Sequence, residues 1–219
     1  YAVAGPAEVR AAVERARAAQ PAWGALPVRE RAAVLERFRD VLVRRRHDVV
    51  ETLTRETGKP AAEALGSEIL IVLDFAVYFA REAARLQRAP WRQAASVAMF
   101  RKRVRIEHVP VGVVGVISPW NYPFMLAAGV VLPALATGNA VLCKPSELTP
   151  ATGVLLGELL LEAGIPDGIV TVLPGDGATG AALASAAVDK VFFTGSVRTG
   201  RQVAMACAEH GITYSLELG

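Results

Sequence analysis

From residue 112 onward, short apolar segments alternate with longer segments in which apolar residues recur with the period of a helix. Strands that are apolar along their whole length are buried on both faces, which is typical of a parallel sheet between layers of helices. The pattern therefore predicts an α/β protein with five parallel strands, four intervening helices and helices on both faces of the sheet. The expected strands are residues 112–117, 140–144, 169–173, 190–193 and 213–218.

The ends of the intervening helices are marked by particular residues. Thr149 and Pro150 are typical of the first residues of a helix, so we expect a helix over residues 149–163 with Thr149 as its N-cap. Pro133 lies inside the helical segment 124–137 and is expected to kink or break it. The other two helices are expected at residues 177–186 and 197–209.

The first third of the chain is predicted to be helical. Apolar residues recur at helical spacing from Val34 to Leu53, and Gly58 followed by Pro60 is a typical helix end. A second helical segment is expected at residues 61–86. Its polar side carries Glu63, Glu68, Asp74, Arg81 and Glu82.

The segment between this helical region and the sheet has a different pattern. Residues 87–93 contain a proline and two arginines, and we expect them to be a connector. In residues 97–109, Val104 and Ile106 alternate with Arg103 and Arg105, which predicts a strand with one edge facing solvent.

Charge and composition exclude several classes of protein. The formal net charge is only +3, and Arg44-Arg45-Arg46 is the one tight basic run, which favours a solvated helix face over a nucleic-acid partner. The apolar stretch 124–143 is interrupted by Pro133 and Gly138, whereas a membrane span needs roughly 20 unbroken apolar residues. Because no such span is present, we expect a soluble protein. Two cysteines form no disulfide framework, which favours the reducing cytoplasm. We predict no metal site.

Functional side chains are expected after the strands, because ligands of parallel sheets bind at the carboxyl ends of the strands. Asn121 lies in a loop that Pro119 and Pro123 make rigid, and a fixed amide donor suits a developing oxyanion. A turn-forming asparagine would give the same pattern. After the next strand, Lys144 can bind ribose hydroxyls or phosphate, and Glu147 can accept from ribose hydroxyls. An exposed ion pair is the alternative.

Glycines and a carboxylate follow the later strands. Gly175 and Gly180 precede a short helix and are by themselves a weak sign of a ligand site. The turn Thr194-Gly195-Ser196 opens the next helix and predicts an anion site at its N-terminus, where Ser196 can also cap the helix. Glu217 lies at the end of the last strand. It is either a general base or a surface carboxylate without a catalytic role.

Together and in this order, the motifs resemble those of the aldehyde dehydrogenase superfamily over nearly the whole chain. The resemblance rests on Pro119-Trp120-Asn121, Lys144-Pro145-Ser146-Glu147, Phe193-Thr194-Gly195-Ser196 with Gly200, Glu217-Leu218-Gly219, and Glu56-Thr57-Gly58-Lys59-Pro60 upstream. It implies a Rossmann-like five-stranded sheet that binds NAD, with NADP possible, in an N-terminal domain spanning residues 1–219. It also implies that residues 97–109 are oligomerisation strands of a homodimer or homotetramer.

The resemblance implies a role for each residue of the motifs. Asn121 is implied to stabilise the oxyanion, and Glu217 to activate the water that hydrolyses the thioester. Lys144 and Glu147 are implied to bind the adenosine ribose, and Gly195 and Ser196 the pyrophosphate. The remaining residues implied to line the cofactor site are Ile117, Ser118, Trp120, Ser146, Gly175, Gly180, Phe193, Thr194, Gly200 and Leu218.

The same resemblance implies a cysteine nucleophile beyond the Glu-Leu-Gly segment. Cys143 lies inside a predicted strand and Cys207 in the middle of a predicted helix, where buried, inert thiols are usual. We therefore expect that the chain stops before the catalytic cysteine, whether by processing or in the gene, and that these 219 residues alone do not oxidise an aldehyde. The alternatives are a coenzyme-A-acylating relative and a non-catalytic nucleotide-binding module or pseudoenzyme. Glu217 favours the hydrolytic enzyme, and Glu147 favours NAD, although Lys144 can tolerate NADP.

Overall fold

A computed structural model describes the whole chain except residues 87 and 89, so part of the expected connector lies outside the described residues. The N-terminal elements are α1 (Pro6–Ala25), α2 (Val28–Arg44), α3 (Arg46–Thr57), α4 (Ala61–Ala64), a π-helical turn (Leu65–Ile69) and α5 (Leu70–Leu86). The sheet region follows as β3 (Val113–Ile117), α6 (Pro123–Ala136), β4 (Ala140–Lys144), α7 (Pro150–Glu162), β5 (Val170–Val172), α8 (Gly177–Ala184), β6 (Lys190–Gly195), α9 (Val197–Glu209) and β7 (Thr213–Leu218).

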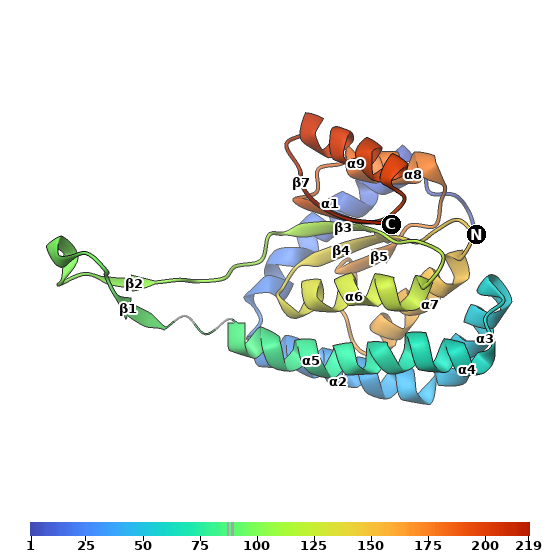
Figure 1. The fold of residues 1–219 in the computed structure, drawn as a ribbon, viewed down its shortest axis with the longest axis horizontal. Helices are drawn as coiled ribbons and strands as arrows, with labels where there is room; N and C mark the ends of the chain where they lie inside the picture. The colour runs from blue at the N-terminus through green and yellow to red at the C-terminus, as the bar shows by residue number, and fades with distance from the viewer. Residues whose placement is uncertain (87, 89) are drawn as a thin grey trace.

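The predicted parallel sheet is confirmed. Its five strands lie in the order β5-β4-β3-β6-β7, and every neighbouring pair is parallel. Helices α6 and α7 cover one face, with α2 and α5 outside them, and α1, α8 and α9 cover the other face (Figure 1). Strands β3 and β4 are buried along their full length, whereas β7 at the edge of the sheet is largely exposed.

Two details of the helical prediction need correction. The helix expected to continue through Leu53 ends at Arg44, and a new helix, α3, begins at Arg46. Helix α6 continues through Pro133, which therefore does not break it. Because proline has no N–H group, the helix lacks one hydrogen-bond donor at this position. The buried apolar residues of α6 pack in the core and hold the helix in place despite this loss. The predicted stop at Gly58 is confirmed, since its backbone is left-handed with φ 76°.

The strand predicted over residues 97–109 is much shorter in the structure. Only β2 (Arg103–Arg105) is a strand, and it pairs with β1 (Trp91–Gln93), while Val97–Met99 is a short 3₁₀ helix. The pair projects from the body as a narrow arm (Figure 1). The β1–β2 ladder has only three residue pairs, and no described strand pairs with the chain between Arg105 and β3. The oligomerisation role of the arm stays a prediction.

Helix α7 begins differently from the prediction. Thr149 occupies the N-cap position, but its side chain makes no capping hydrogen bond. The carboxylate of Glu56, at the end of α3, accepts instead from the backbone N–H groups of Ala151 and Thr152, both at 2.8 Å. A carboxylate at a helix N-terminus satisfies unpaired donors and complements the helix dipole. Glu56 thus joins the helical region to the sheet region.

We expect E56A to lower the free energy of unfolding by about 1–3 kcal/mol, because it leaves two helix donors without an acceptor. Urea unfolding followed by circular dichroism measures this change. The matched control is E51A on the same helix, whose side chain is 78% exposed, and its effect should stay within about 0.5 kcal/mol. Equal losses in the two variants would show that the contacts of Glu56 with α7 do not stabilise the fold.

Candidate functional site: a cleft at the carboxyl edge of the sheet

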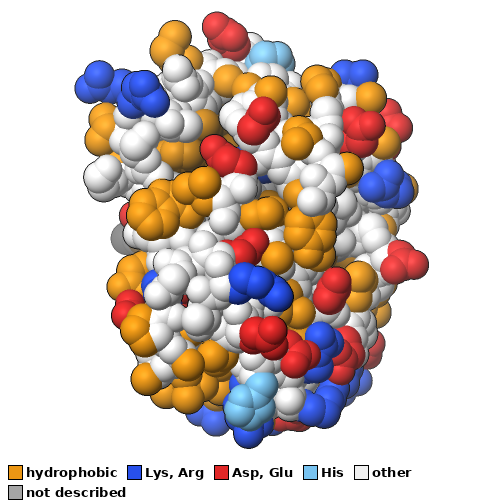
Figure 2. Space-filling model, turned by 90° about the vertical axis from the view of Figure 1, so that its right-hand side faces the viewer, with side chains coloured by type: hydrophobic (Ala, Val, Ile, Leu, Met, Phe, Trp, Pro, Cys, Tyr) orange, Lys and Arg blue, Asp and Glu red, His pale blue; other side chains and the backbone are white. Residues whose placement is uncertain are grey.

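The topology opens a crevice between two central strands. The chain leaves β3 toward β4 and β5 on one side, and then returns to β6 on the other side of β3. The loops that follow β3 and β6 therefore diverge, and ligands of open parallel sheets bind at such a switch point. A cleft of about 420 Å³ lies there. Figure 2 looks onto this edge, where hydrophobic side chains lie among both acidic and basic ones.

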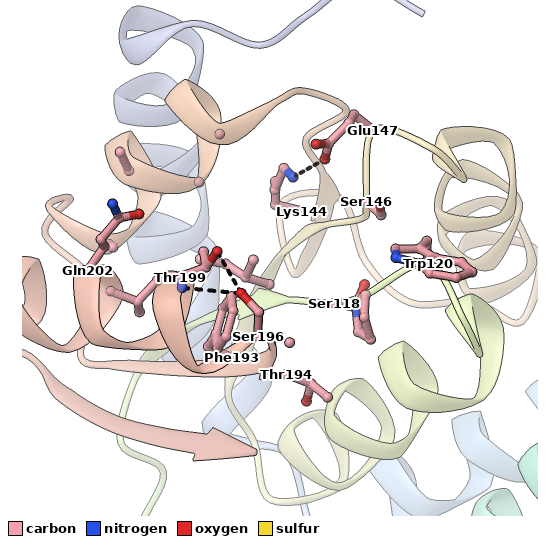
Figure 3. Close-up of a pocket in the computed structure, with 18 of the residues that line it drawn as sticks. Ser118, Trp120, Lys144, Ser146, Glu147, Phe193, Thr194, Ser196, Thr199 and Gln202 are labelled. Carbon is pink, nitrogen blue, oxygen red and sulfur yellow. Dashed lines mark hydrogen bonds and ion pairs between the residues drawn. The ribbon is translucent and has the colours of Figure 1, made fainter. Parts of the chain in front are cut away.

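Most of the predicted cofactor residues are brought together in this cleft. They come from the ends of β3, β4 and β6 and from the starts of α8 and α9 (Figure 3). The predicted residues that line the cleft are Ile117, Ser118, Trp120, Lys144, Ser146, Glu147, Gly180, Phe193, Thr194, Gly195 and Ser196. The convergence of segments far apart in the sequence follows from the parallel sheet, which gathers all strand ends at one edge.

Five predicted residues do not line the cleft. Asn121, Gly175, Gly200, Glu217 and Leu218 lie outside its lining. Gly200 faces β7 instead, where an added Cβ would lie 2.4 Å from the Cδ2 atom of Leu218, so this glycine allows α9 to pack closely on the sheet. Glu217 is exposed and lies beside Thr194 in the β6–β7 register. The roles of these five residues stay predictions.

Sequence reasoning missed one wall of the cleft, which helices α8 and α9 supply. The missed lining residues are Pro119, Gly177, Ala181, Ala184, Thr199, Gln202, Val203 and Ala206. Apart from Pro119, they recur at intervals of three and four residues along α8 and α9, so each helix presents one face to the cleft. That spacing was visible in the sequence, but it did not tell which face of each helix would meet a ligand.

Lys144 and Glu147 form a polar pair at one side of the cleft. The Nζ atom of Lys144 lies 3.3 Å from a carboxylate oxygen of Glu147, and the side chains are 6% and 55% exposed, respectively. A hydrogen bond from its own backbone N–H, assisted by the charge of Lys144, lowers the pKa of Glu147. The carboxylate is therefore ionised at neutral pH, and it can accept hydrogen bonds from a ligand's hydroxyl groups.

Among the four helices that start at this edge, α9 differs in how its N-terminus is satisfied. Carboxylates accept from the first turns of α6, α7 and α8, and they belong to Glu68, Glu56 and Asp176. At α9 the acceptor is the neutral hydroxyl of Ser196, which receives the N–H of Thr199 at 3.3 Å and confirms the predicted cap. The positive end of the α9 dipole is thus compatible with an anionic ligand.

Two further observations fit a ligand at this position. Gly195 lies so close to Phe193 that an added Cβ would come within 2.7 Å of the aromatic ring, so a larger residue would displace the ring or the turn. The buried Ser118 hydroxyl has no well-formed hydrogen bond to a described residue and interacts only with the thiol of Cys143, a weak partner. The residue lines the cleft, although its hydroxyl oxygen itself is buried.

The geometry agrees with what comparison with known proteins shows. A sequence model described as the aldehyde dehydrogenase family matches residues 1–219. The chain belongs to the aldehyde dehydrogenase family. The curated 4,4'-diapolycopene aldehyde oxidase of Methylomonas sp is 42% identical over 219 residues, which are 100% of this chain and 41% of that protein.

Solved structures of the family show the same fold. The NAD-dependent aldehyde dehydrogenase from Sinorhizobium meliloti is 37% identical with a TM-score of 0.92, over 99% of this chain and 43% of that one. An NADP-dependent enzyme of E. coli is 38% identical with a TM-score of 0.92, over 98% of this chain and 44% of that one. The chain thus spans less than half the length of each of these relatives.

Neither cysteine has the surroundings of an activated thiol. Burial raises the pKa of the Cys143 thiol to about 12, and the nearby Ser118 and Lys144 oppose this only in part. Burial also raises the pKa of Cys207. The side chains are 1% and 0% exposed, respectively, which confirms the prediction of buried thiols. A nucleophilic cysteine needs a depressed pKa and access to its substrate.

We expect the native protein at pH 8 to resist labelling by a disulfide reagent, since a raised pKa keeps both thiols protonated at that pH. The same reagent should label both cysteines rapidly after unfolding in guanidinium chloride, which is the internal control. Fast labelling of the folded protein would contradict the burial of these thiols.

Proposed function

We propose that these 219 residues are the cofactor-binding part of an NAD(P)-dependent aldehyde dehydrogenase that oxidises an aldehyde to a carboxylic acid. The observation that supports this most is the cleft between β3 and β6, where the open N-terminus of α9 shares one cavity with Lys144 and Glu147. An anion site and a hydroxyl-binding pair in one cleft suit a dinucleotide, which combines a pyrophosphate with ribose. No helix among the described residues is long and apolar enough to cross a bilayer.

Each part of the cleft then has a role in holding the cofactor. Lys144 and Glu147, beside Ser146, bind the adenosine ribose, and the backbone at Gly195 with the Ser196 hydroxyl binds the pyrophosphate. The segments around Ile117 and Thr194 line the side toward the nicotinamide. When bound there, the cofactor supplies the acceptor for the hydride that leaves the substrate.

The ionised Glu147 supports a preference for NAD. Its carboxylate can accept from ribose hydroxyls and repels the additional 2′-phosphate of NADP. Lys144 beside it can offset part of that repulsion, so NADP binds more weakly without being excluded. Both choices occur among the relatives, since one is named NAD-dependent and another NADP-dependent.

Two residues outside the cleft lining complete the proposed site. The side-chain amide of Asn121, in the loop after β3, donates to the oxyanion that develops from the aldehyde oxygen. Glu217, at the end of β7, accepts a proton from the water that hydrolyses the acyl intermediate. Its position beside Thr194, which lines the cleft, supports this role. A hydrolytic base also favours an acid-forming enzyme over a coenzyme-A-acylating one.

We expect the protein to bind NAD, and K144M to weaken binding by about tenfold to a hundredfold, because it removes a charged hydrogen-bond donor worth about 1.5–3 kcal/mol. Isothermal titration calorimetry with NAD and NADP gives the dissociation constants. The matched control is K190M, the same substitution at the amino end of β6, where the ammonium lies over the Phe192 ring. Equal effects of the two substitutions would contradict the assigned cleft. NADP binding about tenfold tighter than NAD would contradict the preference.

We expect these 219 residues, supplied with NAD and an aldehyde, to form no reduced cofactor, because both thiols are buried and protonated. Ultraviolet absorbance of the reduced nicotinamide measures turnover, with an active aldehyde dehydrogenase as the positive control. Steady formation of reduced cofactor would show that one of the two cysteines, or another residue, acts as the nucleophile.

A further inference from the structure

Lys59 is an almost buried ammonium group with three partners. Its side chain is 11% exposed, and its Nζ atom lies 2.5 Å from a carboxylate oxygen of Glu68. The same nitrogen donates to the backbone oxygen of Asn121 at 2.5 Å and lies 3.8 Å from the centroid of the Tyr122 ring. An ammonium group has three donors and binds favourably to aromatic faces, so these contacts fix its position.

Glu68 connects this ammonium to the start of helix α6. The sequence pattern placed Glu68 on a polar helix side, but the side chain is 0% exposed. Its second oxygen accepts from the backbone N–H groups of Phe124 at 2.9 Å and Met125 at 3.1 Å. The period of a helix places Glu68 on the polar side, but it does not show that the N-terminus of another helix lies against that side.

The pair therefore fixes both ends of the segment 121–125. Lys59 binds the backbone at Asn121, and Glu68 binds the first turn of α6. Between these anchors, the side-chain oxygen of Asn121 accepts from the N–H of Tyr122 at 3.1 Å. The amide nitrogen of Asn121 makes no hydrogen bond with any described residue, so it is the end of this side chain that can serve a substrate. The preceding residue, Trp120, lines the cleft.

We infer that Lys59 and Glu68 are positioning residues, which together orient the Asn121 amide. This inference rests on the proposed function insofar as Asn121 is the oxyanion donor. Preorganised donors contribute to catalysis only when their direction is fixed before the reaction. Buried ion pairs seldom stabilise a fold more than apolar residues of similar size would, so a role in orientation accounts for this pair better than stability does.

The first test measures the order of the segment directly and needs no catalysis. Hydrogen–deuterium exchange is followed in the unaltered protein, in K59M and in K59M/E68Q. The double variant leaves no unpaired buried carboxylate, and it replaces K59M if that variant does not fold. We expect the amides of residues 120–125 to exchange about tenfold faster in both variants, with exchange elsewhere unchanged. K59R, which keeps the charge and the donors, should restore most of the protection.

The control for this test is again K190M, which removes an ammonium from beside an aromatic ring at the opposite end of the sheet. It should leave exchange at residues 120–125 unaltered. Unchanged exchange of this segment in a folded K59M or K59M/E68Q protein would overturn the inference, and so would uniform acceleration over the whole chain.

The second test separates orientation from cofactor binding in the catalytically active full-length enzyme. We expect K59M to lower kcat about tenfold or more, since misplacing a catalytic group by about 1 Å can cost about a hundredfold. The dissociation constant for NAD should change by less than about twofold, because Lys144 and Ser196 are left in place. Equal losses in kcat and in NAD affinity, or an unchanged kcat, would overturn the inference. If the unaltered enzyme oxidises no aldehyde, the proposed function fails, whereas the exchange experiment still decides whether the pair orders the segment.

Discussion

The parallel arrangement of the sheet forces four helix N-termini onto one edge of the molecule. Each of α6, α7, α8 and α9 begins where a strand has just ended, and each brings unpaired N–H groups to that edge. Carboxylates accept from three of these N-termini, whereas only the hydroxyl of Ser196 accepts at α9. The positive ends of the other three helix dipoles are thus compensated by carboxylates, which is why we propose the anion site at α9.

The helical region before the sheet has a larger role in the site than a covering layer would have. Glu56 and Glu68 both come from this region, and each satisfies the first turn of a helix that follows a central strand. Lys59 lies between them in the sequence and reaches the loop after β3. The short stretch from Glu56 to Glu68 thus joins the starts of α6 and α7 to the helical region. Its contribution depends on contacts between residues about 55 to 95 positions apart, which explains why the pattern of the stretch itself shows only helices and a turn.

Much of the sheet could be predicted because its signal is local. The bounds of β4, α9 and β7 agree with the predicted residues, since wholly apolar strands and amphipathic helices follow from the periods of the two structures. The strand prediction failed at residues 97–109, where the alternation was present but a pairing partner of sufficient length was not. Thr149 failed as a capping side chain because Glu56, remote in the sequence, accepts from the same N–H groups. In both cases the outcome depended on the presence or absence of a tertiary partner, which the local pattern does not show.

The class of the fold, the order of the elements and most of the polar residues at the strand ends could be predicted from the amino-acid sequence, because apolar periodicity and turn residues act over a few positions. The meeting of Lys144, Glu147, Gly195 and Ser196 also follows from the sequence, since parallel strands share one carboxyl edge. Three features became visible only in three dimensions. They are the hydroxyl rather than carboxylate acceptor at the start of α9, the faces of α8 and α9 that line the cleft, and the burial of Glu68 against α6. The physical reason is that burial and pairing of charges depend on which distant groups come within hydrogen-bond distance, and no local pattern specifies that.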